Sequence, residues 1–165
     1  MDSVMLTSEE EKMSIRDLRR DEIARLCEIE RRCFSDPWSP ELFLTTLKAR
    51  FTHGQGIALG QKAERLVGYI IYQCFLGEGH ILNFAVDPVY QRRGFGRLLL
   101  ATVLHRMEEE GYTETYLELR KGNRVARRLY ESVGFVACGE RPGYYDNRED
   151  AIVMVRRVSK ATQPG

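Results

Sequence analysis

The sequence predicts an α/β protein in which one β-sheet carries helices on both faces. Two β-prone segments in the first half, 56–59 and 66–75, are joined by a short polar turn, which is the pattern of a hairpin. The second half alternates short apolar segments with longer stretches of helical periodicity, which is typical of strands connected by helices. Between them, residues 81–86 form a nearly unbroken apolar run, as expected of a central strand covered on both faces.

Length and composition predict a single folded domain. The chain has 165 residues, of which 43% are hydrophobic and 30% are charged, and these proportions are ordinary for a globular protein. We expect the domain to occupy residues 14–158. A flexible segment at 1–13 and a frayed tail at 159–165 are expected at the two ends.

The charges nearly cancel, with 25 lysines and arginines against 24 aspartates and glutamates. No overall field therefore favours nucleic acid or an anionic membrane, and any electrostatic recognition must be local. The first residues have the features of neither a signal peptide nor a transit peptide, and no apolar run approaches the roughly 20 residues that span a bilayer. We expect a cytoplasmic protein without a direct nucleic-acid or membrane partner.

The cysteines and histidines have none of the spacings that hold a metal ion. No Cys-x-x-Cys pair occurs, and the residues are far apart in the chain. We expect no metal site, and buried thiols in a reducing compartment. The residues concerned are Cys27, Cys33, Cys74 and Cys138, together with His53, His80 and His105.

The first elements are predicted from capping residues. Residues 15–18 form a predicted strand, and a helix follows for which Asp21 is the N-cap and which ends before Pro37. A second helix begins with Ser39 as its cap and Pro40 at its first position.

The later elements are predicted from periodicity. Two stretches repeat apolar residues at helical spacing, and each is followed by a glycine, which commonly closes a helix. The strand between them alternates, with Tyr116 and Glu118 on one face. In chain order the elements are a helix at 94–110 closed by Gly111, a strand at 115–119, a helix from the cap Asn123 to Gly134, and strands at 135–138 and 151–155.

The turn after the apolar run has the composition of a phosphate cradle. Gly94 and Gly96 directly precede an apolar helix, whose first free amides attract phosphate oxygens. Arg92, Arg93 and Arg97 add positive charge there. The residue types exclude two better known phosphate-binding motifs. A Walker loop ends in Gly-Lys-Ser/Thr, and a dinucleotide fingerprint needs a third small residue where this sequence has Leu99. On this motif alone, a glycine turn without a ligand is an equal alternative.

Four segments of the sequence resemble a known family. The segment 83–99, with Gln91-Arg92-Arg93-Gly94-Phe95-Gly96 at its centre, resembles the coenzyme A signature of the GNAT acetyltransferases, Gln/Arg-x-x-Gly-x-Gly/Ala. Segments 116–135 and 144–151 resemble the RimI-type branch of that family, which acetylates protein N-termini. Asp36-Pro37-Trp38-Ser39 resembles the early helix-loop of the same branch. The similarity covers residues 14–157.

The resemblance implies a fold and a cosubstrate. It implies a mixed, mostly antiparallel central sheet of six to seven strands, and acetyl-CoA without a metal. Main-chain groups at 84–86 would pair with the pantetheine arm, and the glycine turn would hold the diphosphate. The implied cofactor-binding residues are Phe84, Ala85, Val86, Arg92, Arg93, Gly94, Phe95, Gly96, Arg97, Asn123 and Tyr130.

The resemblance also implies the catalytic residues. Glu118 would be the general base, directly or through water, and the Tyr130 hydroxyl would protonate the leaving thiolate. From spacing alone, Glu118 is better explained as a solvated strand residue and Tyr130 as a core aromatic. Trp38, Tyr144 and Tyr145 are either walls of a peptide groove or structural packing, with equal weight. A cysteine nucleophile is disfavoured because no cysteine adjoins a histidine in a recognisable arrangement.

By the same resemblance the acceptor is a protein N-terminus, the N-terminal alanine of the eighteenth small-subunit ribosomal protein. One alternative keeps the fold and changes the acceptor to a lysine side chain, a polyamine or another small amine. Another is a non-catalytic acyl-CoA-binding module, which has no need of both an acid and a base. The oligomeric state is expected to be a monomer or a weak dimer.

Overall fold

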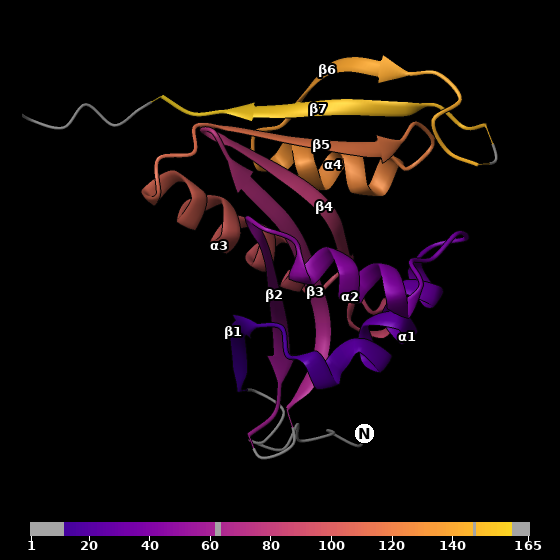
Figure 1. Ribbon diagram of the computed structural model, residues 1–165, viewed down its shortest axis with the longest axis vertical. Helices are drawn as coiled ribbons and strands as arrows, with labels where there is room; N and C mark the ends of the chain where they lie inside the picture. Colours follow the sequence, from indigo (N-terminus) through magenta and orange to yellow (C-terminus); the bar gives the residue numbers. More distant parts are fainter. Residues whose placement is uncertain (1–11, 62–63, 147, 160–165) are drawn as a thin grey trace, which may run out of the picture. The chain divides into compact units, whose positions relative to one another are not determined.

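The computed structural model describes residues 12–61, 64–146 and 148–159. These residues form two compact units (Figure 1). Unit 1 contains the described residues of Met1–Ile71 and Asn83–Leu99, and unit 2 contains those of Tyr72–Leu82 and Leu100–Gly165. Most of the predicted end segments, 1–13 and 159–165, lies outside the described residues.

Within the described residues, seven strands form one sheet in the order β1-β2-β3-β4-β5-β7-β6, and most of the pairings are antiparallel. The predicted fold class is confirmed. The strands are β1 (Met13–Asp17), β2 (Thr52–Leu59), β3 (Arg65–Phe75), β4 (Glu78–Val86), β5 (Glu114–Arg120), β6 (Val136–Arg141) and β7 (Ala151–Arg157). The helices are η1 (Arg20–Glu22), α1 (Ile23–Cys33), α2 (Pro40–Lys48), η2 (Pro88–Tyr90), α3 (Phe95–Glu109) and α4 (Arg124–Ser132).

In unit 1, α1 and α2 pack against β3 and β4 through one apolar cluster. Phe43 and Tyr69 are at its centre, with their ring centroids 5.7 Å apart. Burying large apolar side chains of this kind is the main favourable term in folding. Other members of the cluster are Leu26, Cys27, Ile29, Leu66, Ile71 and Ala85.

The predicted caps of unit 1 are confirmed for α2 and wrong for α1. The Ser39 hydroxyl accepts a hydrogen bond from the Leu42 amide at 3.1 Å, and Pro40 is the first residue of α2. Asp21 does not cap α1 but lies inside the short helix η1. Glu22 is the N-cap residue of α1 without a side-chain cap bond, and its carboxylate instead caps η1 by accepting the Arg19 amide at 2.8 Å.

In unit 2, an arginine of β7 connects the end of α4 with the part of α3 that follows Leu99. Arg156 of β7 joins both helices, because its guanidinium pairs with Glu108 at 2.6 Å and donates to the Val133 carbonyl at 2.7 Å. Gly111 and Gly134 follow these helices with φ of 92° and 101°, which confirms both predicted C-terminal glycines.

Two predictions about burial are wrong in part. β4 is the middle strand of the sheet, as predicted, but Leu82 is 36% exposed, so one face of the strand is not fully covered. Cys27 and Cys74 are buried, whereas Cys138 is exposed because all of β6 lies at the edge of the sheet.

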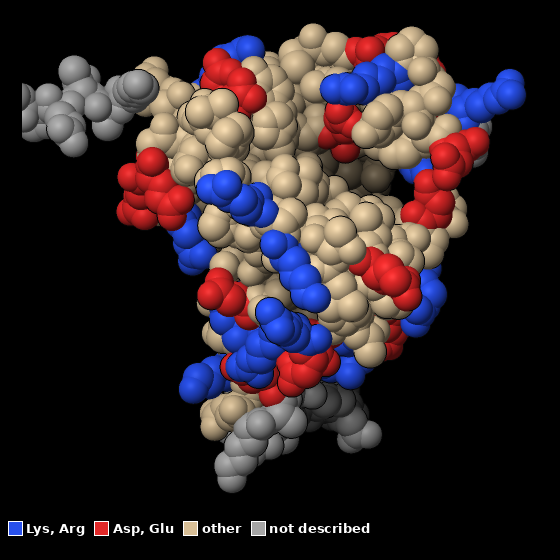
Figure 2. All heavy atoms as spheres, in the orientation of Figure 1, with Lys and Arg blue, Asp and Glu red and all other residues tan. Residues whose placement is uncertain are grey.

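The described surface carries charges of both signs. On the face drawn in Figure 2, lysines and arginines lie beside aspartates and glutamates. None of the helices in the described ranges is long and apolar enough to cross a membrane.

Candidate active site

The end of β4 is fixed by a buried carboxylate in unit 1. Asp87 is 0% exposed and accepts the guanidinium groups of Arg25 at 2.7 Å and Arg32 at 2.9 Å. It also accepts the Val89 amide at 3.1 Å, which caps η2. Burial by itself raises the pKa of Asp87, but the hydrogen bonds from Arg25 and Val89 outweigh it and lower that pKa. The strand end is thereby held against α1.

The chain turns from η2 into α3 through backbone that suits an anion. Arg92 and Gly94 have φ of 64° and 84°, and a side chain added at Gly94 would meet nothing within 4 Å. The Leu98 amide makes the first helical bond, to the Gly94 carbonyl at 3.0 Å, so the amides before it are available to a ligand. Consecutive main-chain N–H groups in such a turn form an anion-binding nest.

The predicted arginines surround this turn. Arg92, Arg93 and Arg97 are all exposed, and Arg93 also lies over the Tyr90 ring at 5.6 Å. The Gln91 side chain donates to the Val86 carbonyl at 2.8 Å, which ties the turn back to the end of β4. Free amides, an open glycine and three cations fit a diphosphate group. In unit 1, the predicted cradle and the predicted pantetheine strand at 84–86 are therefore brought together.

In unit 2, Glu118 lies near the carboxyl end of β5 on the half-exposed face of that strand, as predicted. Its carboxylate keeps 25% exposure and pairs with Arg141 of β6 at 2.9 Å. The Tyr144 hydroxyl donates to the same carboxylate, and this hydrogen bond raises the pKa of Tyr144. A half-exposed carboxylate with two directional partners is held in place and remains open to a third group.

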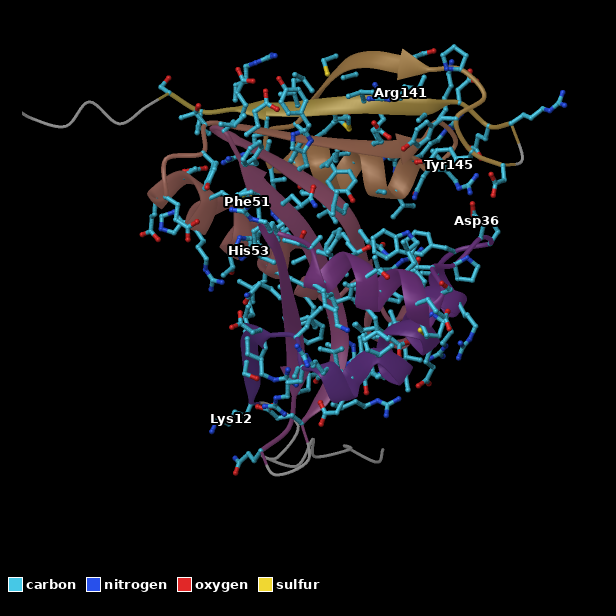
Figure 3. The ribbon with its side chains drawn as sticks, in the orientation of Figure 1. Lys12, Asp36, Phe51, His53, Arg141 and Tyr145 are labelled. Atoms are coloured by element: carbon cyan, nitrogen blue, oxygen red, sulfur yellow. The ribbon has the colours of Figure 1, made fainter. Side chains whose placement is uncertain are left out.

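Tyr145 lies beside this carboxylate cluster, in the segment between β6 and β7 (Figure 3). Its ring contacts that of Tyr144 at 5.1 Å, and the Arg120 guanidinium lies 4.0 Å from its centroid. Burial raises the pKa of Tyr145 to about 12. Tyr144 and Tyr145 therefore adjoin Glu118 in unit 2, as a wall beside a reacting group would.

Tyr130 and Asn123 come from α4 of the same unit. Asn123 caps the helix, as predicted, and its side chain accepts the Ala126 amide at 3.2 Å. Tyr130 is buried, and its ring packs edge-on against Phe135 at 5.7 Å. Burial, and secondarily the electrostatic interaction with the neighbouring Tyr145 hydroxyl, raises the pKa of Tyr130, so its hydroxyl stays protonated well above neutral pH.

Known proteins match the chain over most of its length. The model of the Acetyltransferase (GNAT) family matches residues 23–135. The [Ribosomal protein bS18]-alanine N-acetyltransferase of Escherichia coli (strain K12) is 36% identical over 149 residues, which cover 88% of this chain and 98% of the relative. The chain belongs to the GNAT acetyltransferase family.

Solved structures of this family have the same fold. The crystal structure of the ribosomal-protein-S18-alanine N-acetyltransferase from Escherichia coli has a TM-score of 0.82 and 33% identity, and the match covers 92% of this chain and 97% of that chain. The crystal structure of Ard1 from Thermoplasma volcanium has a TM-score of 0.81 and 27% identity, covering 89% of this chain and 98% of that chain. The first of these supports the RimI-type branch that the motifs predicted, and the second shares the fold.

Trp38, the third predicted wall residue, belongs to unit 1. It lies in the segment between α1 and α2, where its ring packs on Phe43 at 5.3 Å and its amide donates to Glu30 at 3.1 Å. It is half-buried, so one part of the ring is core packing and another part faces solvent. Its role towards a substrate stays a prediction.

Sequence reasoning missed the arginines that surround this GNAT carboxylate. Arg141 and Arg120 are both register partners of Ala151, one from β6 and one from β5. Glu149 pairs with Arg120 at 3.5 Å and accepts the Gly122 amide at 2.9 Å. No local motif marks these residues, because the sheet register decides which side chains become neighbours.

Proposed function

We propose that this GNAT protein transfers the acetyl group of acetyl-CoA to the α-amine of a protein N-terminus. The observation that carries the proposal is the half-exposed Glu118 carboxylate, oriented by Arg141 and Tyr144. It is supported by relatives that are named as N-acetyltransferases of a ribosomal protein alanine. A carboxylate with this exposure suits proton removal from an incoming amine.

The cosubstrate supplies an acetyl group activated as a thioester. The main-chain amides of Phe95, Gly96 and Arg97 would hold its diphosphate, and Arg92 and Arg93 would add charge pairing. Backbone groups of residues 84–86 would pair with the pantetheine arm, and an amide there would polarise the thioester carbonyl. Asn123 and Tyr130 would contact the cofactor from α4.

The proposed chemistry moves two protons. An α-amine with a pKa near about 8 is mostly protonated at neutral pH. Glu118 takes a proton from it, directly or through water, and the neutral nitrogen then attacks the acetyl carbon. The new N–C bond forms as the C–S bond breaks, and the Tyr130 hydroxyl gives its proton to the departing sulfur. The raised pKa of Tyr130 keeps that proton in place until it is needed. The acylated nitrogen loses its second proton, which passes through solvent to restore the tyrosine hydroxyl, and Glu118 returns its own proton to solvent.

The proposed acceptor is the N-terminal alanine of ribosomal protein bS18, in the bacterial cytoplasm. In unit 2 its backbone would lie along Tyr144 and Tyr145, whose rings offer apolar walls with polar edges. Trp38 of unit 1 is proposed as a separate contact for the acceptor. This acceptor follows from what the relatives are named to act on.

The acceptor is tested with four amines and one readout. One peptide carries the bS18 N-terminal sequence with a free α-amine and an internal lysine, and its partner has the α-amine blocked. Spermidine and free alanine are the small-amine controls. Mass spectrometry should locate the acetyl group on the α-amine, with the blocked peptide at least about tenfold slower. Preference for the lysine or for spermidine would contradict the acceptor, and cofactor binding without turnover would favour a non-catalytic module.

A further inference from the structure

Glu30 is a buried carboxylate that the proposed chemistry does not use. It lies in the last turn of α1 and is 2% exposed. Its Oε1 accepts the Trp38 amide at 3.1 Å, and its Oε2 accepts both the Asn83 side-chain amide at 2.9 Å and the Tyr69 hydroxyl. One side chain thus joins α1 to the segment before α2, to β3 and to β4, all within unit 1.

The three partners are neutral groups that donate, so the site is matched to an acceptor-only side chain. A carboxylate has two oxygens that accept and nothing that must donate, whereas a glutamine presents an NH₂ group on one side. Burial raises the pKa of Tyr69 and the nearby Glu30 charge raises it further, so the tyrosine stays a donor. Burying a carboxylate is unfavourable unless hydrogen bonds satisfy it, and here they come from three separate elements.

The connections lead to both predicted ligand segments of unit 1. Trp38 belongs to residues 34–39, which we call the acceptor loop, and Figure 3 labels Asp36 in the same loop. Asn83 directly precedes the 84–86 segment predicted to bind the cofactor arm. The end of α1 makes a second contact there, because the Cys33 thiol donates to the Val86 carbonyl at 3.3 Å. Burial raises the pKa of Cys33 to about 11, so it remains a neutral donor.

The ring of Trp38 is fixed separately from its backbone. It packs on Phe43, which in turn packs on Tyr69, with centroid distances of 5.3 and 5.7 Å. Glu30 holds the main chain of the loop while the aromatic contacts hold the side chain. Removing the carboxylate should therefore loosen the loop backbone without dissolving the apolar cluster around it.

The geometry points to Glu30 as a positioning residue that fixes the acceptor loop at Trp38 against β4 and so sets acceptor affinity. The claim that Glu30 sets acceptor affinity rests on the proposed N-terminal acetylation, whereas the claim that it fixes the loop backbone does not. Glu30 is too buried to touch the substrate, and its oxygens already serve three donors.

The test uses Trp38 as its own reporter, because it is the only tryptophan in the chain. In Glu30→Gln, acrylamide quenching of Trp38 fluorescence should rise about twofold, as the loop loses a hydrogen bond to a charged acceptor. The KM for the bS18 peptide should rise about tenfold, with kcat and the KM for acetyl-CoA changing less than about threefold.

Ile29→Val is the matched control, because Ile29 is the neighbouring residue of α1 and is fully buried in the same cluster. It should lower the melting temperature while leaving quenching and peptide KM at wild-type values. If Glu30→Gln keeps wild-type quenching and KM, or if Ile29→Val changes both equally, the positioning role is overturned.

Tyr69→Phe keeps the test usable if Glu30→Gln does not fold. Tyr69→Phe removes one hydrogen-bond donor to Glu30 and leaves the bond from the Trp38 amide. Quenching and the peptide KM should therefore both rise, by about half of the logarithmic change expected for Glu30→Gln. No change in either quantity would overturn the proposal. If the wild-type protein acetylates no N-terminal peptide but quenching still increases in the Glu30 and Tyr69 variants, the loop role of Glu30 is supported and only the proposed function is refuted.

Discussion

The two units use carboxylate–arginine pairs differently. In unit 1, Asp87 is fully buried between Arg25 and Arg32, and it holds the strand end that precedes the anion-binding turn. In unit 2, Glu118 remains half-exposed, and its partner Arg141 is 57% exposed. The buried pair supports backbone geometry, whereas the exposed pair leaves a carboxylate that a ligand can reach. The comparison predicts that disrupting the first should lower stability and disrupting the second should alter turnover.

The largest effect is expected for Glu118→Gln, which removes the proposed base. We expect kcat to fall by about 10²- to 10⁴-fold, with the Kd for acetyl-CoA unchanged in calorimetry. Glu114→Gln is the control, because Glu114 lies on the same face of β5 and pairs with Arg157 and Tyr116 instead. It should change kcat less than about threefold. Equal losses in both variants would mean that the face as a whole matters and that Glu118 has no special role.

Tyr130→Phe should lower kcat by about 10²-fold by removing the proposed proton donor. The ring still packs against Phe135, so the melting temperature should stay close to that of the wild type. Single-turnover rates with the bS18 peptide measure the chemical step. An unchanged rate would remove Tyr130 from the mechanism and leave it as a core aromatic.

Asp87→Asn tests the buried pair and its pH dependence. The folded-state pKa of Asp87 is lowered, so its contribution to the free energy of unfolding is complete above the unfolded pKa and is lost as the pH falls through the folded pKa. Urea unfolding at pH 7 should show a loss of about 2 kcal/mol in the variant, which is typical of a lost hydrogen bond to a charged group. The difference between wild type and variant should shrink below about pH 4. A constant difference at all pH values would show that the charge is not responsible.

Gly94→Ala tests whether the anion-binding turn depends on its backbone. A residue with a Cβ at φ of 84° is strained by about 1–2 kcal/mol, so the turn should shift and the Kd for acetyl-CoA should rise about tenfold. Gly77 provides the control: its φ is 83°, and a Cβ there also meets nothing within 4 Å. Gly77→Ala should cause the same loss of stability without weakening the cofactor. Calorimetric titration separates the two variants.

Arg141→Ala should have the smallest effect on stability, below about 1 kcal/mol, because exposed ion pairs contribute little. Both Arg141→Ala and Asp87→Asn break a carboxylate–arginine pair. The main difference between the two pairs is the burial of the carboxylate, so we compare their losses of unfolding free energy. Chemical unfolding at two salt concentrations gives the measurement. A loss as large as that of Asp87→Asn would break the distinction between the two regions.

Much of the fold was predictable because its signals are local. Ser39 and Asn123 begin their helices and Gly111 and Gly134 close theirs, as predicted, since a cap depends on neighbours within one turn. Asp21 is the exception. The competing acceptor Glu22, one residue along the chain, accepts the Arg19 amide, and a short helix precedes α1. Such competition between adjacent capping residues is decided by geometry that spacing does not contain.

The candidate site was predictable where main-chain groups form it. The turn at 91–97 has its glycine and its helix start in one segment, so its backbone geometry follows from the order of residues, and its binding of a diphosphate stays a prediction. Glu118 was located on the correct face of its strand, but its partners Arg141 and Tyr144 were not predicted. These residues come from segments more than 20 positions away, and their approach depends on the pairing of β5, β6 and β7.

The sequence by itself determined most of the elements, most of their caps and the glycine turn before α3, because each results from interactions between residues a few positions apart. Only the tertiary structure decided that Glu118 has Arg141 and Tyr144 as partners and that Glu30 receives donors from three separate elements. The physical reason is that strand register and helix packing bring together side chains distant in sequence. Burial then determines which charges support the backbone and which remain accessible.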